Sequence, residues 1–206
     1  MARAGGAAGH RPGVKPPRHD PWRVLETREL FSAPPWIKVQ SQRVGLPDGR
    51  QVDDFYRVTF PDYALVFAEQ EDGRVLVLRQ YKHGVGAVSL TFPAGTFNDP
   101  SEDPLACAKR ELMEETGYQA ASWRSLGRFV SHANAFGNAA HFFHATGCRK
   151  TAEANSGDLE EMELLLMTRA ELFAAAREGA FKLVSQLAIL GLVTHPELGK
   201  TVGKKV

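Results

Sequence analysis

Residues 94–118 read AGTFNDPSEDPLACAKRELMEETGY, and the second half of this stretch predicts a helix. Asp103 is a suitable N-cap, Pro104 suits the first helical position, and Gly117 suits the left-handed position that ends a helix. The residues expected to face the core follow a spacing of i, i+3, i+7 and i+11, and they are Leu105, Ala108, Leu112 and Thr116. We therefore expect a helix between Asp103 and Gly117 with one buried side.

This helix carries a cluster of carboxylates that does not stabilise the helix itself. Glu111, Glu114 and Glu115 stand at i, i+3 and i+4, so they project from one side of the helix. Like charges at this spacing repel each other by about 0.2–0.5 kcal/mol per pair. A hard divalent cation would remove the repulsion and take the carboxylate oxygens as ligands. An ordinary charged surface helix is the alternative, and the sequence around the glutamates favours the metal site.

The surrounding positions resemble the Nudix box, a family pattern of Gly, five residues, Glu, seven residues and then Arg-Glu-aliphatic-any-Glu-Glu-any-Gly-aliphatic. The positions that match in type and spacing are Glu102, Arg110, Glu111, Leu112, Glu114, Glu115 and Gly117. Tyr118 replaces the final aliphatic residue, and six residues instead of five separate Gly95 from Glu102. The extra residue lies in the loop before the helix, where an insertion can bulge without disturbing the helical carboxylates.

A second segment resembles the ADP-ribose and nucleoside-diphosphate-sugar pyrophosphatase branch of the Nudix family. Residues 79–82 read RQYK and residues 88–95 read VSLTFPAG, where the branch has a text close to RQYR and then Glu-aliphatic-Pro-Ala-Gly. Thr91 stands where the branch usually has Glu. The resemblance implies an enzyme that uses Mg²⁺, or Mn²⁺, to hydrolyse the pyrophosphate bond of a nucleoside diphosphate linked to a sugar. The products would be a nucleoside monophosphate and a sugar phosphate.

The resemblance also implies roles for the residues of the box. Glu111 and Glu115 would ligate the metal directly, together with the main-chain carbonyl of Ala94. Glu114 would be a further ligand or would support the other carboxylates. Arg110 is expected to orient the carboxylates through charge-assisted hydrogen bonds, with an ordinary surface ion pair as the alternative. Glu115, Glu114 and Arg110 are therefore candidate catalytic residues.

The general base is expected on a loop beyond the box. In the branch that this chain resembles, the base often lies in an acidic stretch just before a strand. Residues 158–163 read DLEEME and occupy that place, so Glu160 or Glu161 is the candidate base. A solvated acidic loop is the alternative for either residue.

Substrate contacts are expected around the loop between residues 131 and 141. The candidates by resemblance are Arg79, Gly95, His132, Asn134 and Asn138. Asn138 stands where ADP-ribose enzymes usually have a Glu, and their Ser-Pro-Gly is also missing. Loss of that Glu would remove a third metal contact or alter the choice of substrate, so the expected substrate is ADP-ribose or another nucleoside-diphosphate sugar. His141 and His144 are expected to belong to a half-buried strand, and Gln80 and Tyr81 to pack.

The pattern of elements predicts an α+β fold, an α/β/α sandwich of the Nudix type. A mixed β-sheet would lie between helices, preceded by a small N-terminal antiparallel sheet. Strands are expected at 36–45, 52–60, 63–69, 75–81, 89–92, 123–131, 139–146 and 161–167, with further helices at 168–178 and 183–194. The expected divisions are a loosely attached tail (1–20), N-terminal strands that dimerise and cover the substrate (21–62), the Nudix domain (63–196) and a C-terminal tail (197–206).

Composition limits the partners. With 206 residues and 43% hydrophobic residues, the chain can bury the core of one domain. Its net charge of +1 argues against a generic polyanion binder, so no nucleic acid is expected. No apolar run approaches the length of about eighteen residues that a membrane helix needs, so no membrane is expected. Cys107 and Cys148, the two cysteines, are far apart, which is typical of reduced thiols in a cytoplasmic protein.

Aromatic residues are frequent near the N-terminus, namely Trp22, Phe31, Trp36, Phe55 and Tyr56. In the resembling branch this region contacts a second subunit, so a homodimer is expected, and a monomer with these residues in its core is the alternative. Two other functions remain open. The first is a Nudix hydrolase for dinucleotides or modified nucleotides, and the second is an inactive ligand-binding or regulatory module. The intact set of helical glutamates argues against the inactive module.

Overall fold

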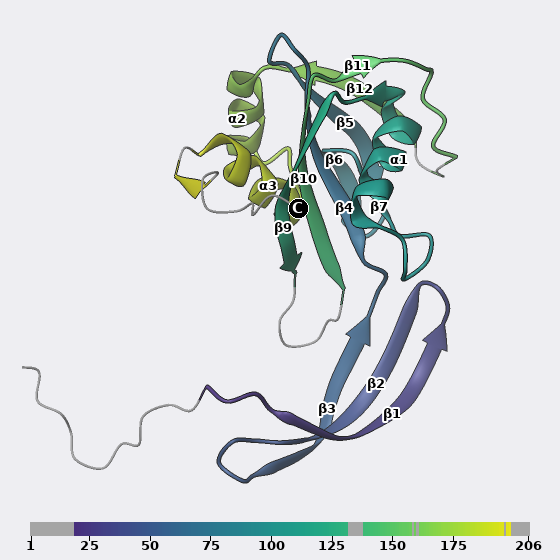
Figure 1. The fold of residues 1–206 in the computed structure, drawn as a ribbon, viewed down its shortest axis with the longest axis vertical. Helices are drawn as coiled ribbons and strands as arrows, with labels where there is room; N and C mark the ends of the chain where they lie inside the picture. Colours follow the sequence, from purple (N-terminus) through teal and green to yellow (C-terminus); the bar gives the residue numbers. More distant parts are fainter. Residues whose placement is uncertain (1–18, 132–137, 158, 160, 196, 199–206) are drawn as a thin grey trace, which may run out of the picture.

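The computed structural model describes residues 19–131, 138–157, 159, 161–195 and 197–198. The chain forms a head, from Asp62 onward, and an arm of residues 22–59 that projects from the head (Figure 1). The head carries the helices and the larger sheet, whereas the arm is a sheet of three strands. The expected α+β fold with a small N-terminal antiparallel sheet is confirmed.

The main sheet of the head has seven strands. The strands of the head are β4 (Tyr63–Glu69), β5 (Val75–Lys82), β6 (Ala87–Thr91), β7 (Ala94–Thr96), β9 (Ser122–Val130), β10 (Ala139–Thr146), β12 (Met162–Met167) and a separate short pair, β8 (Tyr118–Gln119) with β11 (Arg149–Lys150). The order is β12-β5-β4-β10-β9, with β6 paired to β5 and β7 paired to β4. Because β4 and β10 are parallel and the other pairs are antiparallel, the sheet is mixed, as expected.

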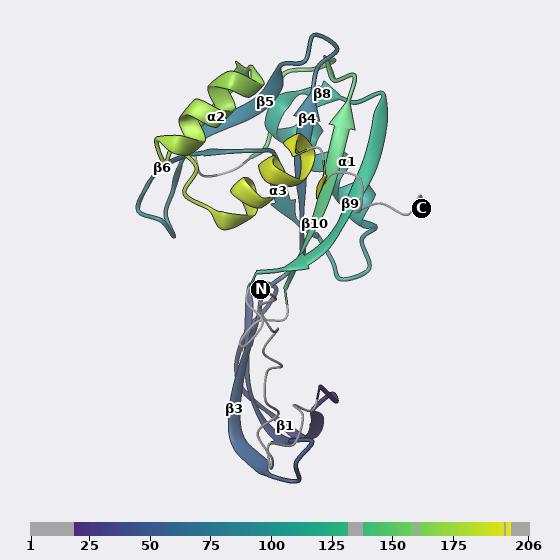
Figure 2. The same cartoon turned by 90° about the vertical axis from the view of Figure 1, so that its left-hand side faces the viewer.

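Helices cover both faces of this sheet (Figure 2). They are α1 (Pro104–Thr116), α2 (Arg169–Arg177) and α3 (Val184–Thr194). Side chains alternate along β4, so Leu65 and Phe67 pack in the cluster that includes α2 and α3, while Ala64 and Val66 pack in the cluster that includes α1. This arrangement is the expected α/β/α sandwich. Within the described residues, no helix is long and apolar enough to cross a membrane.

The arm is an antiparallel sheet with the order β1-β2-β3. Its strands are β1 (Arg23–Ala33), β2 (Ile37–Gly45) and β3 (Gln51–Thr59). The sequence predicted the second and third strands but not β1. The sequence of β1, RVLETRELFSA, mixes charged and apolar residues without alternation, and nine of its eleven residues are exposed. No buried face therefore left a periodic signal in this segment.

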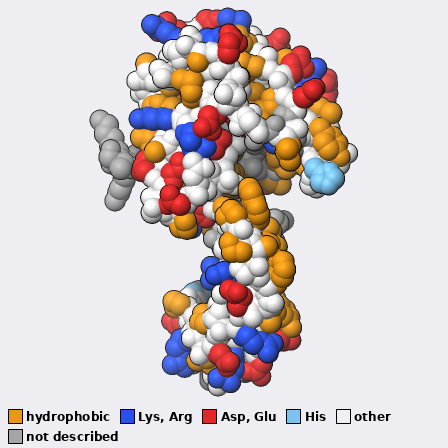
Figure 3. Space-filling view, turned by 90° about the vertical axis from the view of Figure 1, so that its right-hand side faces the viewer, with side chains coloured by type: hydrophobic (Ala, Val, Ile, Leu, Met, Phe, Trp, Pro, Cys, Tyr) orange, Lys and Arg blue, Asp and Glu red, His pale blue; other side chains and the backbone are white. Residues whose placement is uncertain are grey.

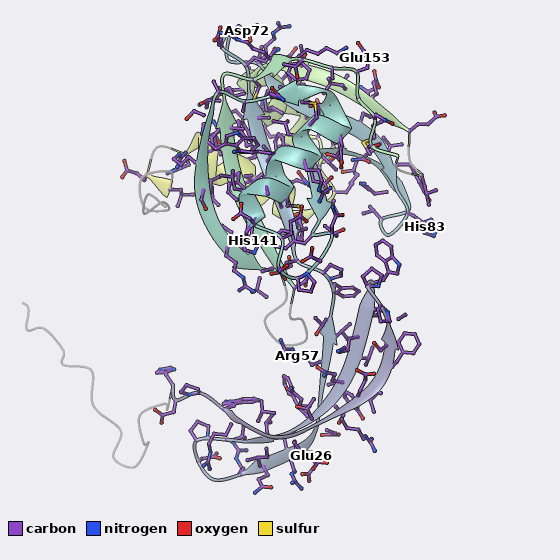
Figure 4. All side chains as sticks on the ribbon, turned by 45° about the vertical axis from the view of Figure 1, so that its right-hand side comes forward. Glu26, Arg57, Asp72, His83, His141 and Glu153 are labelled. Atoms are coloured by element: carbon purple, nitrogen blue, oxygen red, sulfur yellow. The ribbon has the colours of Figure 1, made fainter. Side chains whose placement is uncertain are left out.

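Asp62 joins the arm to the head. Its backbone carbonyl accepts a hydrogen bond from the N–H of Phe97 at 3.0 Å. Its carboxylate accepts a second one from the N–H of Ala139 at 2.7 Å and lies 3.5 Å from Nε2 of His141. Figure 4 shows His141 at the end of the head from which the arm extends. The same residue thus ties the start of β4 to the loop before α1 and to the start of β10.

Helix α1 begins and ends where its sequence predicts. The carboxylate of Asp103 accepts a hydrogen bond from the N–H of Ala106 at 2.9 Å. Gly117 has φ of 74°, and its N–H donates to the carbonyl of Met113 at 2.8 Å. A Cβ on Gly117 would lie 2.1 Å from the carbonyl oxygen of Ala152, so both the backbone conformation and the neighbouring backbone at Ala152 require glycine here.

We predict that Gly117→Ala lowers the free energy of unfolding by about 2–4 kcal/mol, because it combines strain at positive φ with a backbone clash. The matched control is Gly73→Ala, since Gly73 also has a positive φ, 82°, but a Cβ there would meet no atom within 4 Å. Urea unfolding followed by circular dichroism measures both. Equal losses in the two variants would show that the clash at Ala152 contributes nothing.

Candidate active site

The first and last glutamates of the helical cluster are buried against the segment that precedes α1. Glu111 is 9% exposed and Glu115 is 6% exposed. One carboxylate oxygen of Glu115 accepts a hydrogen bond from the backbone N–H of Ala94 at 2.9 Å. The structure thus buries both side chains and places Ala94 in contact with Glu115 through its N–H group.

Gly95 makes room for Glu111. A Cβ on Gly95 would lie 2.0 Å from Cδ of Glu111, which no side chain can tolerate. Strand β7 and helix α1 therefore approach each other closely only because residue 95 lacks a side chain. The sequence proposed Gly95 as a substrate contact, and the structure gives it a further role in placing the carboxylate of Glu111.

Arg110 holds the acidic side chains together. Its Nη1 donates to Glu111 at 2.6 Å and to Glu114 at 3.0 Å, its Nε donates to Glu102 at 3.2 Å, and its Nη2 donates to the carbonyl of Thr96 at 3.0 Å. Burial works to lower the pKa of Arg110, but the hydrogen bonds to the three glutamates outweigh it and raise that pKa. The Arg110 side chain is only 24% exposed, and it lies among the carboxylates rather than in an exposed surface ion pair.

The extra residue in the loop before α1 leaves Glu102 in place. Besides its contact with Arg110, Glu102 accepts a hydrogen bond from the N–H of Asn98 at 2.6 Å. Asp99 accepts a hydrogen bond from the N–H of Ser101 at 2.7 Å and forms a turn between them. The loop therefore absorbs its additional residue in a local turn, and the Glu102 side chain still reaches Arg110.

Cys107 packs against the backbone of β7, a contact that the sequence did not predict. The thiol is buried, and its Sγ lies 3.6 Å from the carbonyl oxygen of Gly95 and 3.7 Å from that of Thr96. Burial raises the pKa of the Cys107 thiol to about 12. The thiol is therefore neutral and unreactive at physiological pH, and it acts here as a small buried side chain.

A cavity of about 640 Å³ opens beside Ala94 and Gly95. Its polar lining side chains are Gln80, Lys82, Thr91, Thr96, Ser131, Asn138, Lys182, Ser185 and Gln186, and its other lining residues are Phe60, Tyr63, Phe92, Ala94, Gly95, Leu183 and Val184. Among these described residues there are two lysines and no carboxylate. The sequence did not identify Lys82, Lys182 or Gln186, because they come from elements far from the box and carry no motif of their own.

The structure brings together some of the expected substrate contacts but not all. Asn138 and Gly95 line the cavity. Arg79 does not, since its guanidinium lies 3.0 Å from the carboxylate of Glu163 in an exposed ion pair. Glu161 is exposed at the start of β12. His132, Asn134 and Glu160 lie outside the described residues.

The sequence also matches models of known families. A model described as NUDIX domain matches residues 59–187. The chain belongs to the Nudix hydrolase family. A second model, described as nucleoside diphosphate sugar hydrolase N-terminal domain, matches residues 22–58, which correspond to the arm of this Nudix hydrolase. The resemblance read from the box and from the segment before it is thereby confirmed.

Individual relatives are distant. The chain is 28% identical to the methanol dehydrogenase activator of Bacillus methanolicus over 157 residues, which cover 76% of this chain and 83% of the relative. It is 27% identical to an ADP-ribose pyrophosphatase of Mycobacterium tuberculosis over 170 residues, or 82% and 78% of the two chains. A solved ADP compounds hydrolase has the same fold, with a TM-score of 0.73 and 18% identity, and the match covers 87% of this chain and 96% of the other.

Nudix hydrolases generally use divalent cations, and the donors around α1 fit such an ion. Glu111 and Glu115 offer carboxylate oxygens one helical turn apart, and both side chains are directed at the backbone of residues 94 and 95. Mg²⁺ typically takes one or two carboxylates and completes its shell with water and phosphate oxygens. Within the described part of the chain, no three His, Cys, Asp or Glu side chains form a closed metal-binding cluster.

We predict that Gly95→Ala lowers kcat by about 100-fold or more, because the added methyl group displaces the carboxylate of Glu111. The control is Gly84→Ala, since a Cβ at Gly84 would meet no atom within 4 Å. Turnover is measured on the nucleotide that the wild type hydrolyses fastest, with the far-ultraviolet circular dichroism spectrum as a test of folding. A folded Gly95→Ala variant with wild-type turnover would contradict the placement of Glu111 in the site.

Proposed function

We propose that this Nudix hydrolase cleaves the pyrophosphate bond of a nucleoside diphosphate linked to a sugar, with Mg²⁺ as cofactor and a nucleoside monophosphate and a sugar phosphate as products. The observation that carries this proposal is the juxtaposition of two regions of opposite charge. The buried carboxylates of Glu111 and Glu115 lie against Ala94 and Gly95, and the cavity that these two residues also line carries two lysines and no described carboxylate.

The cavity is suited to a small anionic molecule. Its volume of about 640 Å³ falls within the range of about 300–1,000 Å³ that is usual for small-molecule sites. Lys82 and Lys182 can each bind a phosphate as a point charge. Phe60 and Tyr63, at the passage from the arm to the head, offer aromatic surface on which a base can stack.

A cation held by the glutamates of α1 would allow a diphosphate to bind beside carboxylates that would otherwise repel it. Glu111, Glu115 and the carbonyl of Ala94 would hold the cation, with Glu114 nearby, and Arg110 would orient Glu111 and Glu114. A bound Mg²⁺ supplies neutralisation of the phosphate charge and activation of water. Glu160 and Glu161 stay as candidates for the general base, to be separated by Glu160→Gln and Glu161→Gln.

The relatives agree with a nucleotide-sugar substrate. One is named for ADP-ribose pyrophosphatase activity, and the model that matches the arm is named for nucleoside diphosphate sugar hydrolases. Asn138 and Thr91 stand where the ADP-ribose branch usually has carboxylates. The proposal therefore names no particular base or sugar for the substrate. A dinucleotide or a modified nucleotide is the second candidate class of substrate.

The test is an assay of the purified full chain with Mg²⁺ and a panel of ADP-ribose, ADP-glucose, GDP-mannose, UDP-glucose, NADH and diadenosine polyphosphates, with products separated by chromatography. Turnover concentrated on one nucleotide sugar supports the proposal. Turnover only on the dinucleotides supports the second class. No turnover in Mg²⁺ or Mn²⁺ contradicts both, and favours a regulatory module, a role for which one relative is named.

We also propose that the chain is a homodimer in which the arms form the interface. The arm exposes large hydrophobic side chains, namely Trp22, Val24, Leu25, Leu30, Phe31, Trp36 and Tyr56. Figure 3 shows hydrophobic side chains gathered on the arm, next to the head. Among the described hydrophobic residues of the arm, only Val44 is buried. A thin three-stranded sheet with so little buried apolar surface is stabilised if another surface covers it, and a second copy can supply one.

We predict that Glu115→Gln lowers kcat by roughly 10²- to 10⁴-fold, because the variant loses the charge that holds the cation. The amide oxygen can still accept the hydrogen bond from Ala94, so the free energy of unfolding changes little. The control is Glu153→Gln, an exposed glutamate that pairs with Lys150 away from the site. Steady-state kinetics on the substrate found in the panel decides, and near-normal turnover of Glu115→Gln would rule out its role as a metal ligand.

We predict that Trp36→Ser weakens the dimer by at least about 10-fold in Kd, since Trp36 is 66% exposed on the arm of the single chain. The control is Val88→Ser, which removes a side chain that is 56% exposed on the head. Light scattering after size-exclusion chromatography, over a range of concentrations, gives the mass of each variant. A wild type that is monomeric at every concentration would contradict the proposed interface.

A further inference from the structure

Gln80 has an amide that the protein satisfies only in part. The residue lies on β5 and is 4% exposed. Its Nε2 donates to Oγ1 of Thr91 at 2.7 Å. Its Oε1 is buried and has no hydrogen-bond partner among the described residues. An unpartnered buried polar atom of this kind costs about 1–3 kcal/mol, so its presence calls for an explanation.

Gln80 and its hydrogen-bond partner Thr91 both line the cavity beside Ala94 and Gly95. The other buried glutamine of the lining, Gln186, differs because its Oε1 accepts a hydrogen bond from the N–H of Phe92 at 2.7 Å. Gln80 is therefore the lining glutamine whose buried carbonyl oxygen has no hydrogen-bond partner among the described residues.

The chemistry of the pair limits what that ligand group can be. An amide oxygen needs a donor, and a phosphate group offers none at neutral pH. A sugar hydroxyl both donates and accepts, so it satisfies the amide in either of its two orientations, and it can also bond the Thr91 hydroxyl. Thr91 carries no charge, which leaves this part of the cavity without a carboxylate that would repel a sugar phosphate.

Gln80 and the aromatic part of the cavity come from different strand pairs of the main sheet. Gln80 pairs with Ser89 of β6, whereas Tyr63 pairs with Thr96 of β7. The stacking surface of Tyr63 and Phe60 and the polar pair of Gln80 and Thr91 thus come from different strand pairs. A base on the aromatic part leaves the polar pair for the other half of the molecule.

We propose that Gln80, held by Thr91, binds a hydroxyl group of the sugar and determines which sugar the enzyme accepts. This inference rests on the proposed function and adds to it the residue that discriminates between substrates. The interaction is a neutral hydrogen bond outside the carboxylate cluster, so Gln80 acts on substrate choice and not on the charge of the reacting phosphates.

The experiment compares Gln80→Met with the wild type on the nucleotide sugar found in the panel and on analogues that lack one sugar hydroxyl each. The wild type loses about 10- to 100-fold in kcat/KM when the hydroxyl that contacts Gln80 is absent. Gln80→Met shows the same loss on the intact sugar and no further loss on that analogue. The matched control is Gln70→Met, because Gln70 also has a buried Oε1 without a partner but does not line the cavity.

The outcomes separate this inference from the function on which it rests. If the wild type hydrolyses no nucleotide sugar, the proposed function fails. If the wild type is active but hydrolyses every single-deoxy analogue equally well, the role of Gln80 is overturned without any variant. An equal effect of Gln80→Met on all analogues, or a change in preference for the base, also overturns it. Thermal unfolding of Gln80→Met and Gln70→Met checks that both variants fold.

Discussion

The site depends on the hydrogen bonds that the guanidinium of Arg110 makes to the surrounding glutamates. It makes hydrogen bonds to Glu102, Glu111 and Glu114 and to the carbonyl of Thr96, and so joins β7 and the loop before α1 to two glutamates of the helix. These carboxylates would repel each other, and the positive charge of Arg110 offsets that repulsion. Arg110 therefore holds Glu102, Glu111 and Glu114 close together.

The close contact between β7 and α1 supports this arrangement of the glutamates. Gly95 allows the backbone of β7 to lie against Glu111, and the buried thiol of Cys107 fills the space beneath Gly95 and Thr96. The segment between β6 and α1 consequently contacts the carboxylates and also lines the cavity. A diphosphate bound in the cavity would lie next to the one place in the described chain where buried carboxylates can offer oxygens to a cation.

Local signals in the sequence predicted the parts of the structure that depend on local interactions. The caps at Asp103 and Gly117 and the spacing of the glutamates all depend on residues within one to four helical turns. Strand β1 was missed because its exposed residues show no periodicity. Arg79 was assigned to the substrate by resemblance, but its strand directs it to Glu163. Gln80, Lys182 and Gln186 meet only in the folded chain, from elements up to about a hundred residues apart, so no motif could reveal the cavity.

The central claim is that the carboxylates of α1 bind a divalent cation, and Mn²⁺ titration followed by electron paramagnetic resonance tests it most directly. The signal of free Mn²⁺ should disappear as the full chain binds the ion, and Mg²⁺ should restore it by competition. A folded Glu111→Gln/Glu115→Gln double variant should leave the free signal intact. Equal Mn²⁺ binding by the wild type and the double variant, or no binding by the wild type even with a nucleoside monophosphate present, would contradict the account.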